Sequence, residues 1–415
     1  METAGRRTKT AGRRTLIVLS FVLVVVMLGY GMVIPIFPFY IERLGGSGRE
    51  MGILVALAAL TELLFGPMWG SLSDRVGRKP VLAVGIFGYA LSLVLMGLAQ
   101  RMWMLVAGRA LSGVLSSATM PTAMAYVGES TSEEERGGGI GILGSAAGLG
   151  VILGPGIGGW LGSDSLSLPF FIGAGLAFVA LLLVGLLLPR ASSQTTETTD
   201  QASEAPADVP EKARRLQTIL RPRRIRRALR GPAGFPLLLL FIVSFGLANF
   251  EAVFGLYAAQ KFGYGPERVG TIIVVIGVVT TLGKGLLTGP LTKRWGEGLV
   301  IKGSMLAGAI GYLVLLAAYN YVTVLLATGL FILSKTVLRP ALLSLISKRS
   351  DGELGAMMGL GNTSINLGRV VGPVWAGFAF DLNIRYPYLS GAGVLALGFL
   401  VSILGLAGCT GGSNP

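Results

Sequence analysis

The sequence predicts an all-α, polytopic membrane protein whose 12 transmembrane helices form two pseudo-symmetric six-helix bundles. The first indication is composition. Hydrophobic residues make up 52% of the chain and charged residues only 13%, and the mean hydropathy of +0.70 lies outside the range of soluble proteins. The second is that apolar runs of about 20 residues, each able to cross a hydrocarbon core of roughly 30 Å, recur along the whole chain. The third is an internal repeat.

The predicted spans fall into two groups of six. The first group lies at about 16–40, 50–70, 80–99, 102–127, 137–161 and 168–188, and the second at about 235–260, 267–290, 299–318, 321–346, 354–379 and 386–408. These limits divide the chain into a basic amino terminus (1–15), an N-terminal bundle (16–188), a central loop (189–234), a C-terminal bundle (235–408) and a tail (409–415).

Basic residues predict the orientation. Lys and Arg are concentrated in the amino terminus, in the central loop and in short loops on one side of the spans, and loops rich in these residues stay in the cytoplasm. We therefore expect both termini in the cytoplasm and the protein in the inner or plasma membrane. The net charge of +14 follows from this topology rather than from nucleic-acid binding. We expect the basic segment 212–230 to lie on the anionic inner leaflet, with a nucleic-acid arm as the alternative.

The internal repeat links the two groups of spans. Landmark residues recur in the same order at an offset of 218 or 219 residues, which indicates two bundles of the same orientation with a substrate site between them. The paired landmarks are Gly52 with Gly270, Gly70 with Gly289, Pro121 with Pro340, and Gly154-Pro155 with Gly372-Pro373.

A charged stretch, GSLSDRVGRK, joins the second and third predicted spans. Gly77 permits a sharp turn, and Asp74 can make charge-assisted bonds to its basic neighbours; a solvated turn is the alternative. The stretch resembles the signature that the major facilitator superfamily carries between helices 2 and 3. In that family it forms a gate, in which the aspartate holds the two halves together on the cytoplasmic side. The matching residues are Gly70, Leu72, Asp74, Arg75, Gly77, Arg78 and Lys79.

Two further motifs resemble the 12-helix drug:proton antiporter branch of this superfamily, which contains multidrug and tetracycline-type efflux transporters. The first predicted span carries the branch's helix 1 motif at Leu28, Gly29, Pro35 and Pro38. The fifth carries a stretch similar to the antiporter motif at Gly150, Gly154, Pro155, Gly158 and Gly159. Apart from the resemblance, glycines four residues apart allow helices to pack closely, and Pro155 adds a kink. Structural packing alone is the alternative to a role as a pivot.

Charged side chains inside the predicted spans are candidate functional groups, because each costs roughly 2.5–3.5 kcal/mol at a helix centre unless it faces a partner or water. Glu251 is the first candidate for the proton-carrying group, since apolar surroundings favour a neutral carboxyl group, and Glu62 is the second. Arg109 corresponds, by the resemblance, to an arginine linked to proton transfer. A structural ion pair is the alternative for Glu62 and Arg109. Residues 16–40 contain no acidic side chain, whereas many members of the branch carry one there.

The resemblance implies that spans 1, 4 and 7 line a substrate cavity. Methionine and aromatic side chains there can adapt to varied apolar ligands, with core packing as the alternative. The embedded bases outnumber the embedded acids, which favours an anionic or zwitterionic substrate. The candidate substrate contacts are Met32, Phe37, Met120, Met124, Phe250, Phe254, Tyr257, Lys335, Arg339 and Arg369.

These features predict a secondary transporter that exports small amphipathic compounds in exchange for protons by alternating access. We expect a monomer in the lipid bilayer, without a cofactor. The alternative is a uniporter, importer or exporter of a metabolite or sugar on the same fold. An enzyme is not expected, because the chain has no histidine and a single cysteine, Cys409, and shows no nucleotide or metal motif.

Overall fold

The computed structural model describes residues 2–131, 133–189, 234–348 and 354–407. Within these ranges every regular element is a helix. Apart from residues 189 and 234, the predicted central loop lies outside the described residues, as does the predicted tail.

The N-terminal half consists of α1 to α8. Turns at residues 34–36 and 117–118 separate α1 from α2 and α5 from α6, so that each of these pairs is one broken span. The helices are α1 (Glu2–Val33), α2 (Phe37–Arg43), α3 (Gly48–Val76), α4 (Arg78–Gly97), α5 (Met102–Ser116), α6 (Thr119–Ser130), α7 (Glu133–Asp164) and α8 (Leu168–Leu187).

The C-terminal half repeats this plan. A short π-helix, η1, interrupts the second span of this half. The backbone at Gly296 leaves the helical region at φ +72°, so α13 contains the end of one span and the whole of the next. The elements are α11 (Gly234–Phe262), α12 (Pro266–Leu282), η1 (Gly283–Leu287), α13 (Thr288–Ala317), α14 (Tyr321–Lys348), α15 (Leu354–Leu382) and α16 (Tyr386–Ala407).

The predicted all-α membrane fold is confirmed. Among the described residues, nine helical stretches are long and apolar enough to cross a membrane. One of them, residues 266–317, is broken at Gly296 and supplies two crossings. The broken pair α5–α6 and the helix α15 occupy the remaining two predicted spans, which together give the expected 12.

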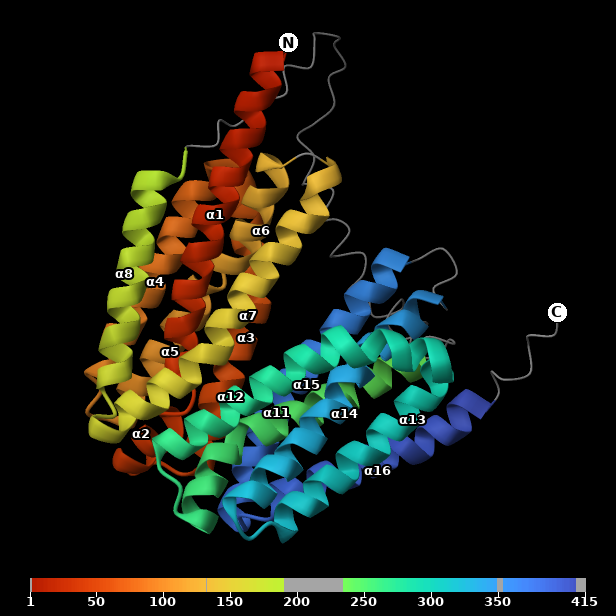
Figure 1. The fold of residues 1–415 in the computed structure, drawn as a ribbon. Helices are drawn as coiled ribbons and strands as arrows, with labels where there is room; N and C mark the ends of the chain where they lie inside the picture. Colours follow the sequence, from red (N-terminus) through yellow and green to blue (C-terminus); the bar gives the residue numbers. More distant parts are fainter. Residues whose placement is uncertain (1, 132, 190–233, 349–353, 408–415) are drawn as a thin grey trace, which may run out of the picture.

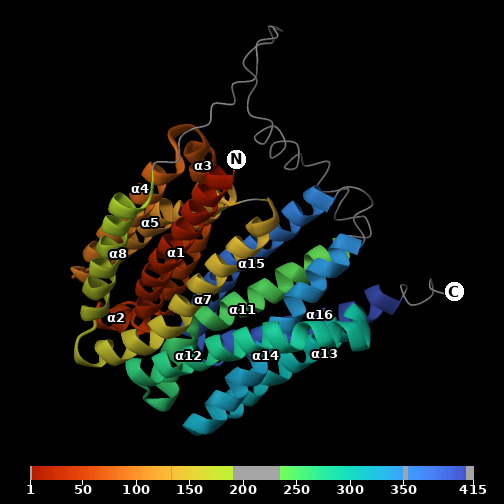
Figure 2. The ribbon, with the colours of Figure 1, turned by 45° about the horizontal axis from the view of Figure 1, so that its top comes forward.

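The two halves meet mainly through two helix pairs, α3 with α15 and α7 with α12. Figures 1 and 2 show the red-to-yellow N-terminal half beside the green-to-blue C-terminal half. Gly52 of α3 lies directly against the carbonyl oxygen of Pro373, and Gly270 of α12 lies against that of Pro155. These four residues are landmarks of the sequence repeat, so the two contacts are equivalent under the internal symmetry.

The glycines of the antiporter motif bring α7 against α1. A Cβ on Gly150 or on Gly154 would lie only 2.5 Å from a backbone oxygen of α1, whereas Gly159, on another face, lies against Pro266 and Gly270 of α12. The helix therefore touches α1 of its own half and α12 of the other half. The Gly368–Gly377 segment of α15 does the same with α11 and α3.

Replacing a glycine in this seam should destabilise the protein. A Cβ on Gly158 would collide with the backbone of Met32, so we expect Gly158→Ala to lower the free energy of unfolding by about 1–3 kcal/mol. Thermal unfolding of the purified protein measures the change. Gly144→Ala is the matched control on the same helix, because nothing lies within 4 Å of the added carbon. Since alanine is the better helix former, this control should be neutral or stabilising; equal losses for both variants would contradict the seam.

In the described residues, the close backbone contacts between the halves lie mainly toward one end. We call the end with Ser47 and Asp381 the closed end, and the end with Gly77 and Gly296 the motif end. Toward the motif end, a Cβ added to Gly66 or Gly70 of α3 would meet no atom of another helix within 4 Å. The side chain of Glu62, between these regions, is 58% exposed. The space between the halves is therefore open toward the motif end.

Candidate functional site

The charged stretch forms a tight turn between α3 and α4 at the motif end. Gly77 has φ +101°, a left-handed conformation that favours glycine, as the sequence predicted. Its counterpart in the repeat, Gly296, has φ +72°. Leu72 and Arg75 are exposed, and Lys79 Nζ donates hydrogen bonds to the carbonyl oxygens of Gly185 (2.8 Å) and Leu188 (2.6 Å) at the end of α8.

Asp74 acts within its own half in this conformation. Arg78 Nη2 lies 2.5 Å from Asp74 Oδ1 and 2.7 Å from Glu129 Oε1, and Arg78 Nη1 donates to Ser73 Oγ at 2.5 Å. These bonds tie the α3–α4 turn to the end of α6. Within the described residues, Asp74 makes no hydrogen bond or ion pair with the C-terminal half, so the aspartate latch predicted from the resemblance is not engaged here.

The C-terminal half carries the same ion pair with its charges reversed. Glu297 Oε1 lies 2.7 Å from Lys348 Nζ and accepts a hydrogen bond from Ser344 Oγ at 2.6 Å. Glu297 and Lys348 stand 219 residues after Arg78 and Glu129, and Lys293 stands 219 residues after Asp74. The charged triad Asp74, Arg78 and Glu129 of the first half thus corresponds to Lys293, Glu297 and Lys348 in the second.

This symmetry predicts that the charges of the first triad can be exchanged together. Arg78→Glu alone should lower stability by about 1–2 kcal/mol, an amount limited by salt screening of the half-exposed carboxylates. The triple variant Asp74→Lys, Arg78→Glu, Glu129→Lys, which copies the second half, should recover most of that loss. Thermal unfolding of the purified variants measures both effects. A triple variant less stable than the single one would refute the equivalence.

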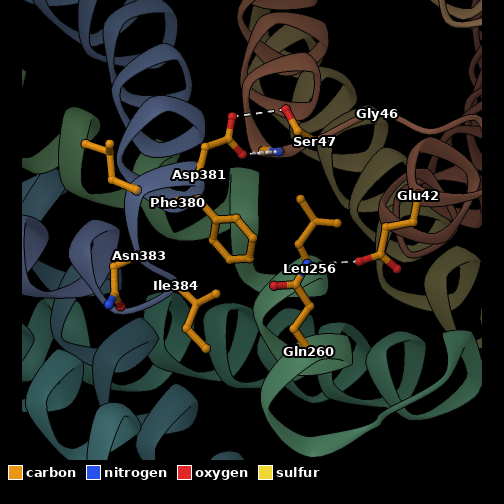
Figure 3. Close-up of a pocket in the computed structure, with 11 residues that line it drawn as sticks. Glu42, Gly46, Ser47, Leu256, Gln260, Phe380, Asp381, Asn383 and Ile384 are labelled. Carbon is orange, nitrogen blue, oxygen red and sulfur yellow. Dashed lines mark hydrogen bonds between the residues drawn. The ribbon is translucent and has the colours of Figure 1, made fainter.

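At the closed end, Asp381 of α15 caps the amino terminus of α3 in the other half (Figure 3). Its carboxylate accepts backbone hydrogen bonds from Gly48 (2.7 Å) and Arg49 (3.2 Å) and one from Ser47 Oγ (3.0 Å). Arg49 Nε lies 3.3 Å from the same group, and its guanidinium lies over the Phe378 ring at 4.4 Å. We call this set of contacts the Asp381 clasp.

The position of Asp381 explains why the clasp stabilises this state. A carboxylate in the last turn of a helix is repelled by the negative end of its own helix, whereas the amino terminus of another helix attracts it. The side chain is only 18% exposed, which weakens screening. Beside the clasp, a cavity of about 510 Å³ opens between the halves, and Gln260 donates a hydrogen bond to Glu42 across it at 3.1 Å.

Charged side chains gather in the space that opens toward the motif end. Arg369 Nη2 of α15 lies 3.5 Å from Glu62 Oε2 of α3, an ion pair between the two halves. Glu251 of α11 interacts electrostatically with both Arg369 and Lys335. Lys335 of α14 is buried, donates to the Val243 carbonyl oxygen at 3.2 Å and lies over the Phe331 ring at 4.6 Å. The structure thus brings together both acidic candidates and two of the basic ones.

The aromatic candidates of α11 lie elsewhere. Phe250, Phe254 and Tyr257 are buried, and Phe250 stacks on Phe254 with ring centroids 4.9 Å apart and packs against Phe331 at 4.8 Å. In this conformation they form part of the core of the C-terminal half, which is the packing alternative stated above.

The candidates of the N-terminal half are divided between core and partly exposed positions. Met32 and Phe37 are buried, and Met120 and Met124 are half-buried. Arg109 lies 5.0 Å from the centre of the Phe37 ring, away from the cluster of Glu62 and Arg369. In the helix 1 motif, Leu28 abuts Gly154 of α7, Gly29 packs on Gly173 of α8, and Pro38 lies against Gly255 of the other half; Pro35 is buried in the turn before α2.

Sequence reasoning missed Asp381, Glu129 and Glu297. Asp381 lies at the end of its predicted span, where a charge is unremarkable, and its partners are more than 330 residues away. Glu129 and Glu297 could have been found by extending the repeat comparison beyond the glycine and proline landmarks to the charged positions.

Comparison with known proteins gives one consistent result. The sequence model of the Major Facilitator Superfamily matches this chain over residues 19–334 and 236–407. Multidrug resistance protein 2 of Bacillus subtilis (strain 168) is 31% identical over 374 residues, covering 90% of each chain. Quinolone resistance protein NorA of Staphylococcus aureus (strain COL) is 25% identical over 391 residues, covering 94% of this chain and 96% of that protein.

A solved structure shows the same fold. A bacterial homologue of the human lysosomal transporter Spinster, in an inward-facing and unoccupied conformation, superposes with a TM-score of 0.69 at 15% identity, covering 96% of both chains. Together with the helical architecture and the family match, this likeness leads to one conclusion: the chain is a multi-pass membrane transporter, not an enzyme, and belongs to the Major Facilitator Superfamily.

Proposed function

We propose that this protein exports small, amphipathic, drug-like compounds in exchange for protons by alternating access. The observation that carries the proposal is the group of ionisable side chains between two halves that meet mainly toward the closed end, with Glu62 and Glu251 both accessible. Such a group suits a site that exchanges protons and substrate. The names of the relatives, multidrug and quinolone resistance proteins, support drug-like compounds as substrates.

The proposal includes an orientation. The motif end faces the cytoplasm, as its basic loops favour, and both termini are cytoplasmic, in the plasma membrane. The conformation described here is then the inward-open state, and the Asp381 clasp closes the outer side. In the outward-open state the clasp separates and the turn at Asp74 meets the C-terminal half. The protein works as a monomer, because each chain holds both halves of the cleft.

Proteoliposomes with an imposed pH gradient test this function. A fluorescent fluoroquinolone is the probe, and its accumulation against its own concentration gradient is measured. Proton exchange predicts uphill accumulation that disappears when a protonophore collapses the pH gradient. Flux that only follows the concentration gradient of the probe, or of a sugar in its place, would instead support the uniporter alternative.

A further inference from the structure

The cations in the cleft are not all neutralised. Among the described residues, the carboxylates near Lys335, Arg339 and Arg369 are those of Glu62 and Glu251. Glu62 pairs with Arg369, and Glu251 lies within electrostatic reach of Arg369 and Lys335. With all five groups ionised, the cluster carries one positive charge in excess.

Arg339 holds that excess. Its side chain is exposed, and among the described residues it has neither a hydrogen bond nor an ion pair. Its strongest charged neighbour is another cation, Arg369. Two guanidinium groups repel each other, so an anion between Arg339 and Arg369 would be attracted by both and would relieve this repulsion.

The helix geometry directs Arg339 into the cleft. It follows Lys335 by four residues on α14, so both lie on one face of that helix, with Arg339 one turn nearer the motif end. Lys335 is held in place by the Val243 carbonyl oxygen and the Phe331 ring. Arg369 faces the same space from α15, since its partner Glu62 belongs to the other half.

We propose that Arg339 and Arg369 bind the anionic head of the substrate, so that this transporter prefers amphipathic organic anions with a carboxylate or a similar oxyanion. A planar guanidinium forms paired hydrogen bonds with such groups. Lys335 adds attraction from one turn deeper. The inference rests on the proposed function, because the rest of the ligand is taken to be the apolar body of a drug-like compound.

Three ligands with one apolar body test the preference: para-octylbenzoate, para-octylbenzamide and para-octylphenyltrimethylammonium. Calorimetric binding to the purified protein in nanodiscs of neutral lipid should show benzoate as the tightest ligand of the wild type. Arg339→Gln should weaken benzoate binding by roughly tenfold to a hundredfold and leave the amide unchanged. Arg268→Gln, a change of an exposed arginine on α12 near the closed end, is the matched control and should alter neither.

A second variant moves the affinity in the opposite direction. Glu62→Gln releases Arg369 from its ion pair and should tighten benzoate binding several-fold, an increase that a misfolded protein cannot give. The inference would be overturned if the wild type bound the trimethylammonium ligand more tightly than the benzoate. It would also be overturned if neither Arg339→Gln nor Glu62→Gln changed the affinity for the benzoate. Proteoliposome transport of the amide separates failure of the anion site from failure of the proposed function. If the amide accumulates against its gradient but the protein shows no preference among the head groups, only the anion site is wrong. If none of the three ligands accumulates, the proposed function is wrong.

Discussion

Glu251→Gln is expected to abolish proton-driven accumulation of substrate while leaving passive exchange intact. The carboxylate lies on α11 within electrostatic reach of Lys335 and Arg369, and a proton that binds it changes the charge of the whole cluster. One unit of pH gradient supplies about 1.4 kcal/mol per proton, enough for roughly tenfold accumulation. The glutamine cannot release a proton, so accumulation should fall to about onefold.

Two measurements in the same proteoliposomes make this result specific. Counterflow, in which labelled substrate exchanges for unlabelled substrate without a gradient, should persist in Glu251→Gln, because exchange needs binding and the access change but no net proton movement. Glu62→Gln is the matched comparison, as the second acidic side chain of the cleft. Gradient dependence that survives in Glu251→Gln and is lost in Glu62→Gln would transfer the proton-carrying role to Glu62.

Asp381→Ala is expected to shift the protein toward the state that is open at the closed end. The variant removes three hydrogen bonds to the amino terminus of α3 and the ion pair with Arg49. Losing charge-assisted bonds of this kind costs about 1–3 kcal/mol. Since all of these bonds join the two halves, the cost falls on this conformation alone, and the population ratio should change by roughly fivefold to 150-fold.

Single-molecule fluorescence between the halves measures the shift. Exposed positions at the closed end, Arg101 in one half and Tyr319 in the other, accept cysteine labels once Cys409 is replaced by serine. The long-distance population should grow in Asp381→Ala and grow less in Asp381→Asn, which keeps one carbonyl oxygen as an acceptor. Asp164→Asn, a change of an exposed carboxylate on α7 at the same end, is the control. An unchanged distribution in Asp381→Ala would show that the clasp does not set the conformation.

Much of the fold could be read from residue type and spacing. In lipid every backbone polar group has to be satisfied within its own segment, so long apolar runs become helices. The repeat landmarks gave the two bundles, and Gly77 gave the tight turn. The embedded charges pointed to the cleft because a charge in lipid is costly. The aromatic candidates of α11 were harder to interpret, since core packing and ligand contact use the same residue types.

Residue type and spacing alone account for the helical fold, the two symmetric halves, the turn at Gly77 and the acids and bases available for function. Which groups meet is known from the packing of the helices: Asp381 caps α3 of the other half, and Glu62 pairs with Arg369, whereas Arg339 has no ion-pair partner within the described part of the chain. The Gly52–Pro373 and Pro155–Gly270 contacts join the halves. The difference lies in the separation along the chain of the residues that interact. Helix formation depends on neighbours within a few residues, whereas these contacts join residues more than 100 positions apart, which only the packing of whole helices brings together.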